Sequence, residues 1–235
     1  MSTSPSFEPM PNSHRHNFYH AIHKALRLGH GRMLAAIGST DFSNAAAAAR
    51  TIDMVREFLM LGRSHLEGEN REIHAALEVR VPGASAHAAD DHEGHEQSFA
   101  ELETMLRAIE MAPAAEKNRA ALVLYHRYAL FAAHDFEHMH EEETELLAAL
   151  HEAFTDDELR AIEGRIVAAI PPAKMAAYLK IMMPAMNQPE RSGMLEHMRD
   201  AMPAPVFETI LNEAVRPSLD PAAFAAATAS LRQAA

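Results

Sequence analysis

The sequence predicts an all-α protein, an antiparallel up-down four-helix bundle with an additional C-terminal helical region. Ala, Leu, Met, Glu and Arg recur at helical spacing, whereas the alternation of β-branched and aromatic residues that marks strands is missing. Of the 235 residues 48% are apolar, which is enough for one large or two small domains. Four long helices with short connections should pack as antiparallel neighbours, because each has one apolar stripe to bury.

The first two helices are predicted from their apolar stripes. After a leader over 1–17, expected to be flexible, a helix over 18–37 places four apolar residues on one side: Phe18, Ile22, Leu26 and Met33. The next helix can be capped by Asp41 or Ser43 and runs to about Glu78. Its stripe consists of Ile52, Val55, Leu59, Leu66, Ile73 and Leu77.

The third and fourth helices complete a predicted domain over 18–154. Pro and Gly in the segment 81–83 break the chain. The third helix is predicted to begin between positions 84 and 90 and to end before Pro113. The fourth helix, over about 114–154, is the longest of the set.

The composition changes after residue 154, and we predict a C-terminal helical extension over 155–235. Thr155 and Glu158 have the spacing of a capping box. Proline is tolerated in the first turn of a helix, so four short helices are expected to begin at Pro172, Pro189, Pro205 and Pro221. The extension is rich in methionine and needs an apolar partner, which is either the bundle or a second copy of the chain.

Cysteine is absent from the sequence, and histidine is abundant, with 16 residues. This excludes disulfides, thiolate catalysis and cysteine-ligated metal sites, and leaves His and carboxylate as the strong metal ligands. The net charge of −12, without a basic cluster, argues against nucleic acid and anionic membranes as partners. There is no run of about 18 apolar residues and no signal-like leader, so we expect a cytoplasmic protein.

The second and fourth predicted helices contain the same short phrase. His138 lies 73 residues after His65, and the same spacing relates four further pairs, which indicates a repeated helical pair: Glu69 and Glu142, Ile73 and Leu146, Ala76 and Ala149, Leu77 and Leu150. The first and third helices each supply a single histidine on the apolar side, His23 and His92.

Position on the helix is expected to bring these groups together. Residues at i and i+4 share a helix face, so each His and Glu of the repeated phrase point the same way, towards the core. Buried together without a cation, such groups would cost several kcal/mol each. We therefore predict two metal ions, iron or manganese in preference to structural zinc or calcium, with bridging glutamates and an open position on each ion. The predicted ligands are His23, His65, Glu69, His92, His138 and Glu142.

The two HxxxE motifs at 65–69 and 138–142, with the single histidines His23 and His92, resemble the hemerythrin-like, HHE cation-binding family. The resemblance covers about 18–154. It implies a non-haem di-iron centre that handles dioxygen, nitric oxide, peroxide or iron itself.

The sequence departs from the oxygen carriers of that family in two places. Those proteins have HxxxH in the third helix, where this chain has His92 and Glu96, and a carboxylate five residues after the fourth-helix histidine, where this chain has Glu143. Losing a fifth histidine would favour sensing or redox chemistry over oxygen carriage. His95 could substitute for it after a slight rotation of the helix, and Glu143 is a reserve ligand.

Further polar residues have weaker claims to a role. His20 and His30 flank His23 and are minor candidates for ligands. His74, nine residues after His65, is expected on the far side of its helix. Asp91, beside His92, is a candidate to accept the outer N–H of a ligating histidine, since ligating imidazoles usually donate their other N–H to an oxygen.

Three functions remain open from the sequence. The first is a binding or sensing protein for oxygen, nitric oxide or iron, with two iron ions for which manganese or zinc could substitute. The second is a di-iron oxidoreductase that reduces peroxide, oxygen or nitric oxide. The third is a helical interaction protein without metal, built around the Met-rich extension, which could also join two copies into a homodimer.

Overall fold

The computed structural model describes residues 15–232, whose regular structure is entirely helical, with no strand. The predicted all-α class is confirmed. The long helices are α1 (Tyr19–Ser39), α2 (Ala45–Glu69), α4 (Ala86–Met111) and α5 (Ala114–Glu141). A π-helical turn (Asn70–His74) and α3 (Ala75–Arg80) prolong α2, and a second π-helical turn (Glu142–Leu146) and α6 (Leu147–Ala153) prolong α5.

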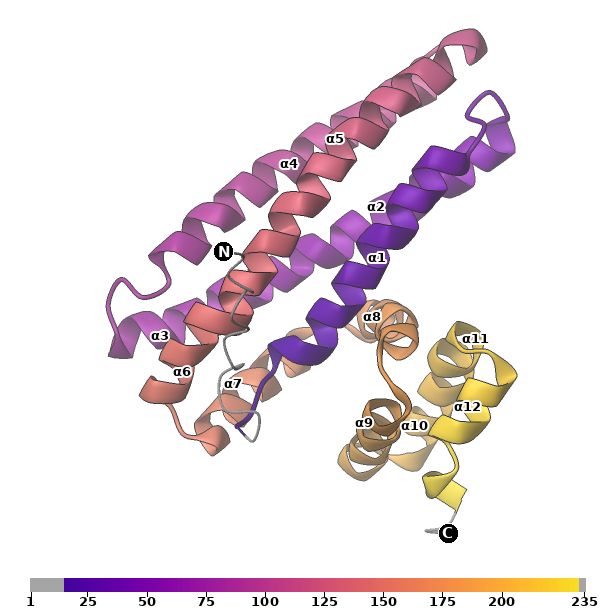
Figure 1. Cartoon of the computed structure of the whole chain (residues 1–235). Helices are drawn as coiled ribbons and strands as arrows, with labels where there is room; N and C mark the ends of the chain where they lie inside the picture. Colours follow the sequence, from indigo (N-terminus) through magenta and orange to yellow (C-terminus); the bar gives the residue numbers. More distant parts are fainter. Residues whose placement is uncertain (1–14, 233–235) are drawn as a thin grey trace, which may run out of the picture.

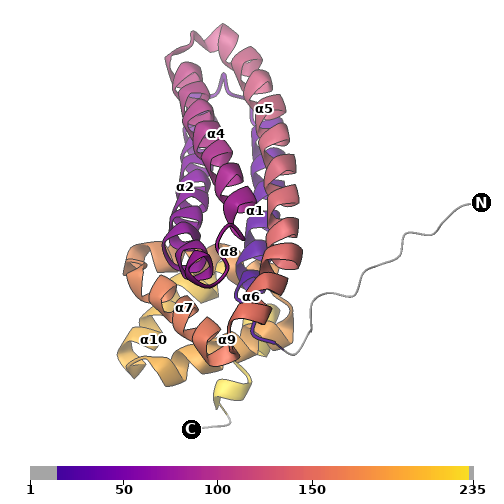
Figure 2. The ribbon, with the colours of Figure 1, turned by 90° about the vertical axis from the view of Figure 1, so that its left-hand side faces the viewer.

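The four long helical segments lie side by side (Figures 1 and 2). The connections 40–44 and 112–113 lie at one end, and the connection 81–85 lies at the other. The cap of α2 was predicted wrongly. Asn44 is the N-cap, and its side chain accepts from the backbone N–H of Ala47, whereas Asp41 accepts from Ser43 within the preceding turn.

The core between the long helical segments consists of two apolar clusters. The larger one includes Leu26, Leu66, Phe99 and Met139. The second lies nearer the end that carries α3 and α6, and its members include Tyr19, Ile73, Ala88 and Leu146. Each long segment contributes to both clusters, and the predicted metal ligands lie near the level where the two clusters meet. Any polar group at that level is therefore enclosed by apolar packing on two sides.

The C-terminal extension begins where the sequence predicts. Thr155 and Glu158 form the expected capping box at the start of α7. The four prolines lie in the first turns of α8, α9, α10 and α12, as predicted. The elements are α7 (Asp156–Ala169), α8 (Pro172–Ala185), α9 (Gln188–Ala201), α10 (Ala204–Ile210), a π-helical turn (Leu211–Val215), α11 (Arg216–Ser218), α12 (Pro221–Ala227) and a 3-10 turn (Ser230–Arg232).

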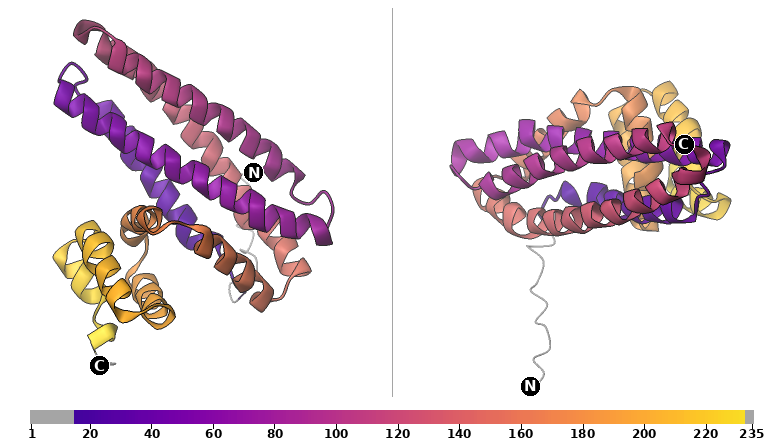
Figure 3. Two further views of the ribbon diagram at one scale, coloured as in Figure 1. Left: turned by 180° about the vertical axis from the view of Figure 1, so that it is seen from behind. Right: turned by 90° about the horizontal axis from the view of Figure 1, so that it is seen from above.

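The extension packs on the long helices and on itself (Figure 3). Leu159 and Ile162 of α7 belong to the second apolar cluster of the long helices, and Tyr178 of α8 donates a hydrogen bond to the carbonyl of Leu61 at 2.7 Å. Met183 is fully buried in a cluster formed largely by the extension. The expected need for an apolar partner is thus met within the chain. The domain boundary at 155 and the homodimer stay predictions.

Within the described range, no helix taken singly has the length and apolar character needed to cross a bilayer. α7 and α8 meet that criterion only as a pair, and they are bent by 116°.

Most of the predicted leader, residues 1–14, lies outside the described residues. Arg15 holds the start of the described chain against α6 and α7, because its guanidinium contacts Asp156 at 2.5 Å and donates to the carbonyls of His151 and Phe154.

Candidate metal centre

Both glutamates of the repeated phrase lie at a π-helical turn. Glu69 is the last residue of α2 before one turn, and Glu142 is the first residue of the other. A π turn inserts an extra residue into a helix and is often found at functional sites. The same local distortion therefore occurs twice, at equivalent positions of the repeat.

All six predicted ligands converge between the four long helical segments. Five of them are almost fully buried, with exposures between 0 and 3%, and the His65 side chain is 12% exposed. The set comes from α1 (His23), α2 (His65, Glu69), α4 (His92), α5 (His138) and the π turn that follows α5 (Glu142). The predicted convergence is thus observed, and the role of each residue as a ligand stays a prediction.

The donor atoms form two groups with the carboxylates between them. In the first group, His65 Nε2 is 3.1 Å from Glu69 Oε1, and His23 Nε2 is 3.3 Å from Glu142 Oε2. Those four residues each offer a donor atom within 4.8 Å of the others. In the second group, His92 Nε2 and His138 Nε2 are 2.9 Å apart, and His92 Nε2 lies 3.7 Å from Glu69 Oε2 and 3.8 Å from Glu142 Oε1. Each glutamate thus has an oxygen near both groups.

The outer nitrogens of three histidines are held by oxygen atoms. His23 Nδ1 is 3.1 Å from Glu143, which also pairs with Arg27. Glu143 therefore contacts the outer nitrogen of His23, and its carboxylate does not lie among the inner donor atoms as a reserve ligand would.

His92 and His138 are supported in the same way. His92 Nδ1 contacts Asn70 Oδ1 at 2.8 Å, and His138 Nδ1 contacts Asp91 Oδ2 at 3.3 Å. The expectation that Asp91 accepts from a predicted ligand is met, but at His138 of the neighbouring helix α5 and not at His92 beside it in the sequence. An Nδ1–H that donates outward leaves Nε2 unprotonated and directed at the cluster.

The inner atoms of the cluster lack hydrogen-bond partners among the described residues. This holds for both oxygens of Glu69 and of Glu142 and for Nε2 of His23 and His65. His92 Nε2 and His138 Nε2 face each other, yet both are acceptors when their Nδ1–H groups donate outward. Buried acceptors that face one another are destabilising, and a cation between them removes that conflict. The residues present therefore fit a metal ion.

Burial and the neighbouring charges together determine the protonation of these groups. It raises the pKa of Glu69 to about 8, helped by the charge of Glu142. Burial opposes the charged form of Glu142 too, but contact with His23 and the charge of His138 outweigh it and lower that pKa to about 2. Burial lowers the pKa of His65 and of His92 to about 3. Neutral imidazole is the form that coordinates a metal.

Two buried residues beside the centre were not predicted to lie there. Tyr19 packs its ring 5.0 Å from that of His23, and its hydroxyl has no partner in the described part of the chain. His74 stacks on His92, so its predicted position on the far side of the helix is wrong. A Tyr four residues before a predicted ligand is a signal that the sequence offers for Tyr19, since i and i+4 share a face.

A second polar cluster lies within the larger apolar cluster, next to the centre. His30 Nε2 is 2.7 Å from Asp135 Oδ2, His95 Nε2 is 3.1 Å from Asp135 Oδ1, and the Tyr128 hydroxyl is 3.2 Å from His30 Nδ1. We call His30, His95, Tyr128 and Asp135 the aspartate network. His95 Nδ1 also contacts the carbonyl of Asp91 at 2.8 Å.

Two candidate metal ligands, His30 and His95, belong to the aspartate network and not to the centre. His30 and His95 are both committed to Asp135 and lie outside the metal-ligand groups. The third minor candidate, His20, is exposed and contacts Glu190. Glu96, at the position of the family's second third-helix histidine, pairs with Arg63 on the surface.

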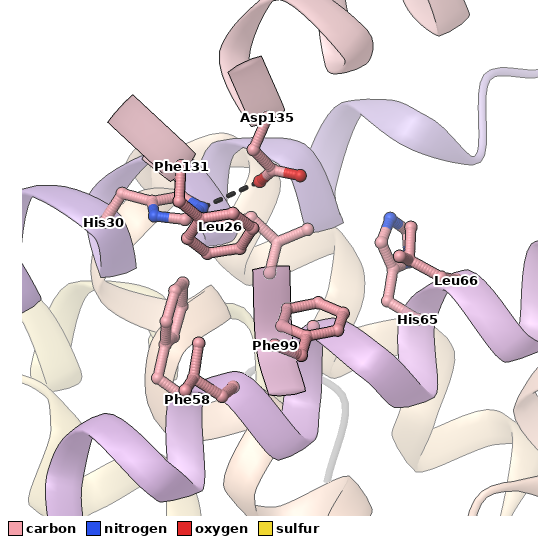
Figure 4. Close-up of a pocket in the computed structure, with 10 residues that line it drawn as sticks. Leu26, His30, Phe58, His65, Leu66, Phe99, Phe131 and Asp135 are labelled. Atoms are coloured by element: carbon pink, nitrogen blue, oxygen red, sulfur yellow. Dashed lines mark hydrogen bonds and ion pairs between the residues drawn. The ribbon is translucent and has the colours of Figure 1, made fainter. Parts of the chain in front are cut away.

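A small cavity lies between His65 of the centre and the His30–Asp135 pair of the aspartate network. Its volume is about 10 Å³, and Figure 4 shows His65 apart from the paired His30 and Asp135, with apolar side chains between them. The wall also includes Leu26, Phe99 and Phe131. Room for about one water-sized molecule therefore exists next to a predicted ligand.

A larger polar pocket of about 390 Å³ opens to solvent beside the centre. It reaches His138 and His95, and its rim is rich in acidic groups: Asp90, Asp91, Glu137 and Glu141. Carboxylates at such a mouth attract cations, so this pocket is a suitable access path to the centre.

No family model matches the chain, and searches of curated proteins and of solved structures find no match. What the geometry establishes is an all-helical protein with buried His and Glu groups that could hold a metal ion.

Proposed function

We propose that the chain is a non-haem di-iron protein of the hemerythrin-like type, which binds or senses oxygen, nitric oxide or iron. In this proposal α1, α2–α3, α4 and α5–α6 form an antiparallel up-down four-helix bundle around the centre. The observation that carries the proposal is the position of Glu69 and Glu142, whose buried oxygens have no hydrogen-bond partners among the described residues and lie between two groups of imidazoles.

The donor set favours iron. Mixed imidazole and carboxylate ligands suit iron and manganese, whereas calcium prefers oxygen alone and structural zinc closes its coordination shell. His23 and His65 would hold one ion, His92 and His138 the other, and both glutamates would bridge. When bound, such a pair supplies an open coordination position and electrons for a small ligand.

The protein residues would control access and orientation. Contacts from Glu143, Asn70 and Asp91 fix the rings of the histidines so that Nε2 faces inward. The apolar clusters on two sides of the centre limit its contact with bulk water, which reaches His138 through the polar pocket. The cavity of about 10 Å³ beside His65 has room for about one water-sized molecule.

A di-iron oxidoreductase is the second candidate, and Tyr19 favours it. Its buried hydroxyl lacks a partner within the described residues, and burial, helped by the charges of Glu142 and Glu69, raises its pKa well above the usual value. A protonated phenol at that place can donate a proton during reduction of peroxide, oxygen or nitric oxide. Sustained consumption with an external reductant would support this candidate, whereas a sensor reaches a stable liganded state and stops.

Metal analysis with an optical spectrum tests the proposal. Full-length protein from iron-replete cells should contain about two iron ions per chain and, after exposure to air, absorb in the near ultraviolet and visible. Less than about one metal per chain would favour the helical interaction protein instead. If the protein contains metal but is colourless, the bound metal is zinc and the proposal of iron is wrong.

A further inference from the structure

The π-helical turn after Glu69 determines where His74 lies. In a regular α-helix, nine residues at about 100° each would place His74 about 180° from His65, on the opposite face. The π turn ends at His74 and accommodates an extra residue, so the nine residues turn the chain about as far as eight α-helical ones. His74 is then only about 80° from His65 and faces the interior.

His74 lies against the second group of donor atoms. Its ring stacks on that of His92, with centroids 4.9 Å apart and an angle of 21° between the planes. His74, His92 and Glu142 each offer a donor atom within 4.8 Å of the others. The residue is 5% exposed, and neither ring nitrogen has a hydrogen-bond partner in the described structure.

Packing alone does not account for a histidine at this position. The equivalent residue of the repeat, 73 positions later, is Leu147, which follows the other π turn and is buried in the apolar cluster. The chain thus fills one of the two equivalent positions with an apolar side chain. The other holds an imidazole with two unsatisfied nitrogens, which is destabilising unless a ligand satisfies it.

We propose that His74 is a fifth histidine ligand, which binds the second metal ion together with His92 and His138. This inference rests on the proposed two-metal centre. The second ion then has three imidazoles and the first, held by His23 and His65, has two. An open position would then be expected where fewer residues hold the ion, at His23 and His65, beside the small cavity that His65 lines.

Titration of the metal-free full-length chain with Co²⁺ tests the assignment. Wild type should bind two ions, and His74→Leu, which copies the residue found at 147, should bind the first ion unchanged and the second at least about ten-fold more weakly. The exposed His140→Leu, on the helix that carries His138, is the control and should match wild type.

The outcomes separate the two proposals. Equal affinity for both ions in wild type and His74→Leu would overturn the role of His74 and leave the two-metal centre intact. A wild type that binds fewer than two ions would overturn the centre itself, and the fifth ligand with it.

A measurement on wild type avoids dependence on the folding of a variant. In the Co²⁺-loaded protein each coordinated imidazole contributes one strongly shifted, exchangeable N–H proton resonance. Five such resonances are expected from the five histidines, and His74→Gln should lose one of them. Four resonances in wild type would overturn the proposal.

Discussion

The candidate metal centre and the aspartate network contain the same kinds of residue in the same interior, but more of the inner polar atoms lack hydrogen-bond partners in the centre. In the aspartate network both oxygens of Asp135 contact imidazoles, and the Tyr128 hydroxyl contacts His30. In the centre both oxygens of Glu69 and of Glu142 lack hydrogen-bond partners among the described residues, as does the Tyr19 hydroxyl. A buried His and carboxylate cluster is therefore not by itself a metal site.

The difference arises from geometry. The aspartate network pairs one carboxylate with two histidines, and an ionised carboxylate can accept from both. The centre places two carboxylates among imidazoles whose N–H groups, at His23 and His138, face outward towards Glu143 and Asp91. Too few protons then remain inside to satisfy the acceptors, and a cation supplies the missing charge.

Removing a bridging carboxylate should give the largest effect. Glu69→Ala and Glu142→Ala are each expected to lose at least one of the two metal ions, because each glutamate contributes to both groups of donors. Elemental analysis of the purified variants measures this loss. Glu145→Ala, exposed in the same π turn as Glu142, is the matched control. Unchanged iron content in both glutamate variants would contradict the bridging role.

Chelation should destabilise the protein through the centre alone. A ligand at about a hundred times its Kd stabilises the folded state by ~2.7 kcal/mol per site, and removing metal should lower the free energy of unfolding accordingly. Denaturant unfolding with and without chelator measures the change. The decrease in unfolding free energy on chelation should be smaller in Glu69→Ala, which has less metal to release. An equal decrease in wild type and Glu69→Ala would show that the chelator acts outside the centre.

Asp135→Asn should lower stability without removing metal. The substitution weakens two charge-assisted contacts, to His30 and His95, and the expected cost is about 2 kcal/mol in the free energy of unfolding. Urea unfolding in the presence of chelator, with metal content determined separately, distinguishes the two effects. If this variant lost iron as completely as Glu142→Ala, the two clusters would not be independent.

The pH dependence of the Asp135→Asn effect sharpens the comparison. Burial opposes the charge of Asp135, but contacts with His30 and His95 outweigh it and hold its pKa well below 3.8, so its stabilisation is present above that value and is lost as the pH falls. Burial would lower the pKa of His95, yet Asp135 raises it above 6.5, so this stabilisation is full below 6.5 and is lost as the pH rises through the raised pKa.

The stabilisation from ionised Asp135 and that from protonated His95 are both present between about pH 4 and 6.5. The difference in unfolding free energy between wild type and Asp135→Asn should be largest in that range and smaller at about pH 9. Chelator-containing urea series at several pH values measure it, and a difference that grew steadily with pH would contradict the pairing of His95 with Asp135.

Much of the fold follows from local sequence. The capping box at Thr155 and the prolines of α8, α9, α10 and α12 mark helix starts that the structure contains. The cap of α2 was mistaken because Asp41, Ser43 and Asn44 are all good capping residues, and the choice among them depends on how the preceding turn folds.

The six residues of the centre were predictable as a set, since two HxxxE motifs 73 residues apart fix four of them on core-facing stripes. The sequence by itself therefore determined the helices, their apolar faces and the level at which His and Glu gather. Only the tertiary structure decided the partners: Asp91 for His138, Asp135 for His95, and the place of His74. The reason is physical, because periodicity assumes a uniform helix and describes one helix at a time. A single π turn rotates every residue beyond it, and a hydrogen-bond partner on another helix is set by packing.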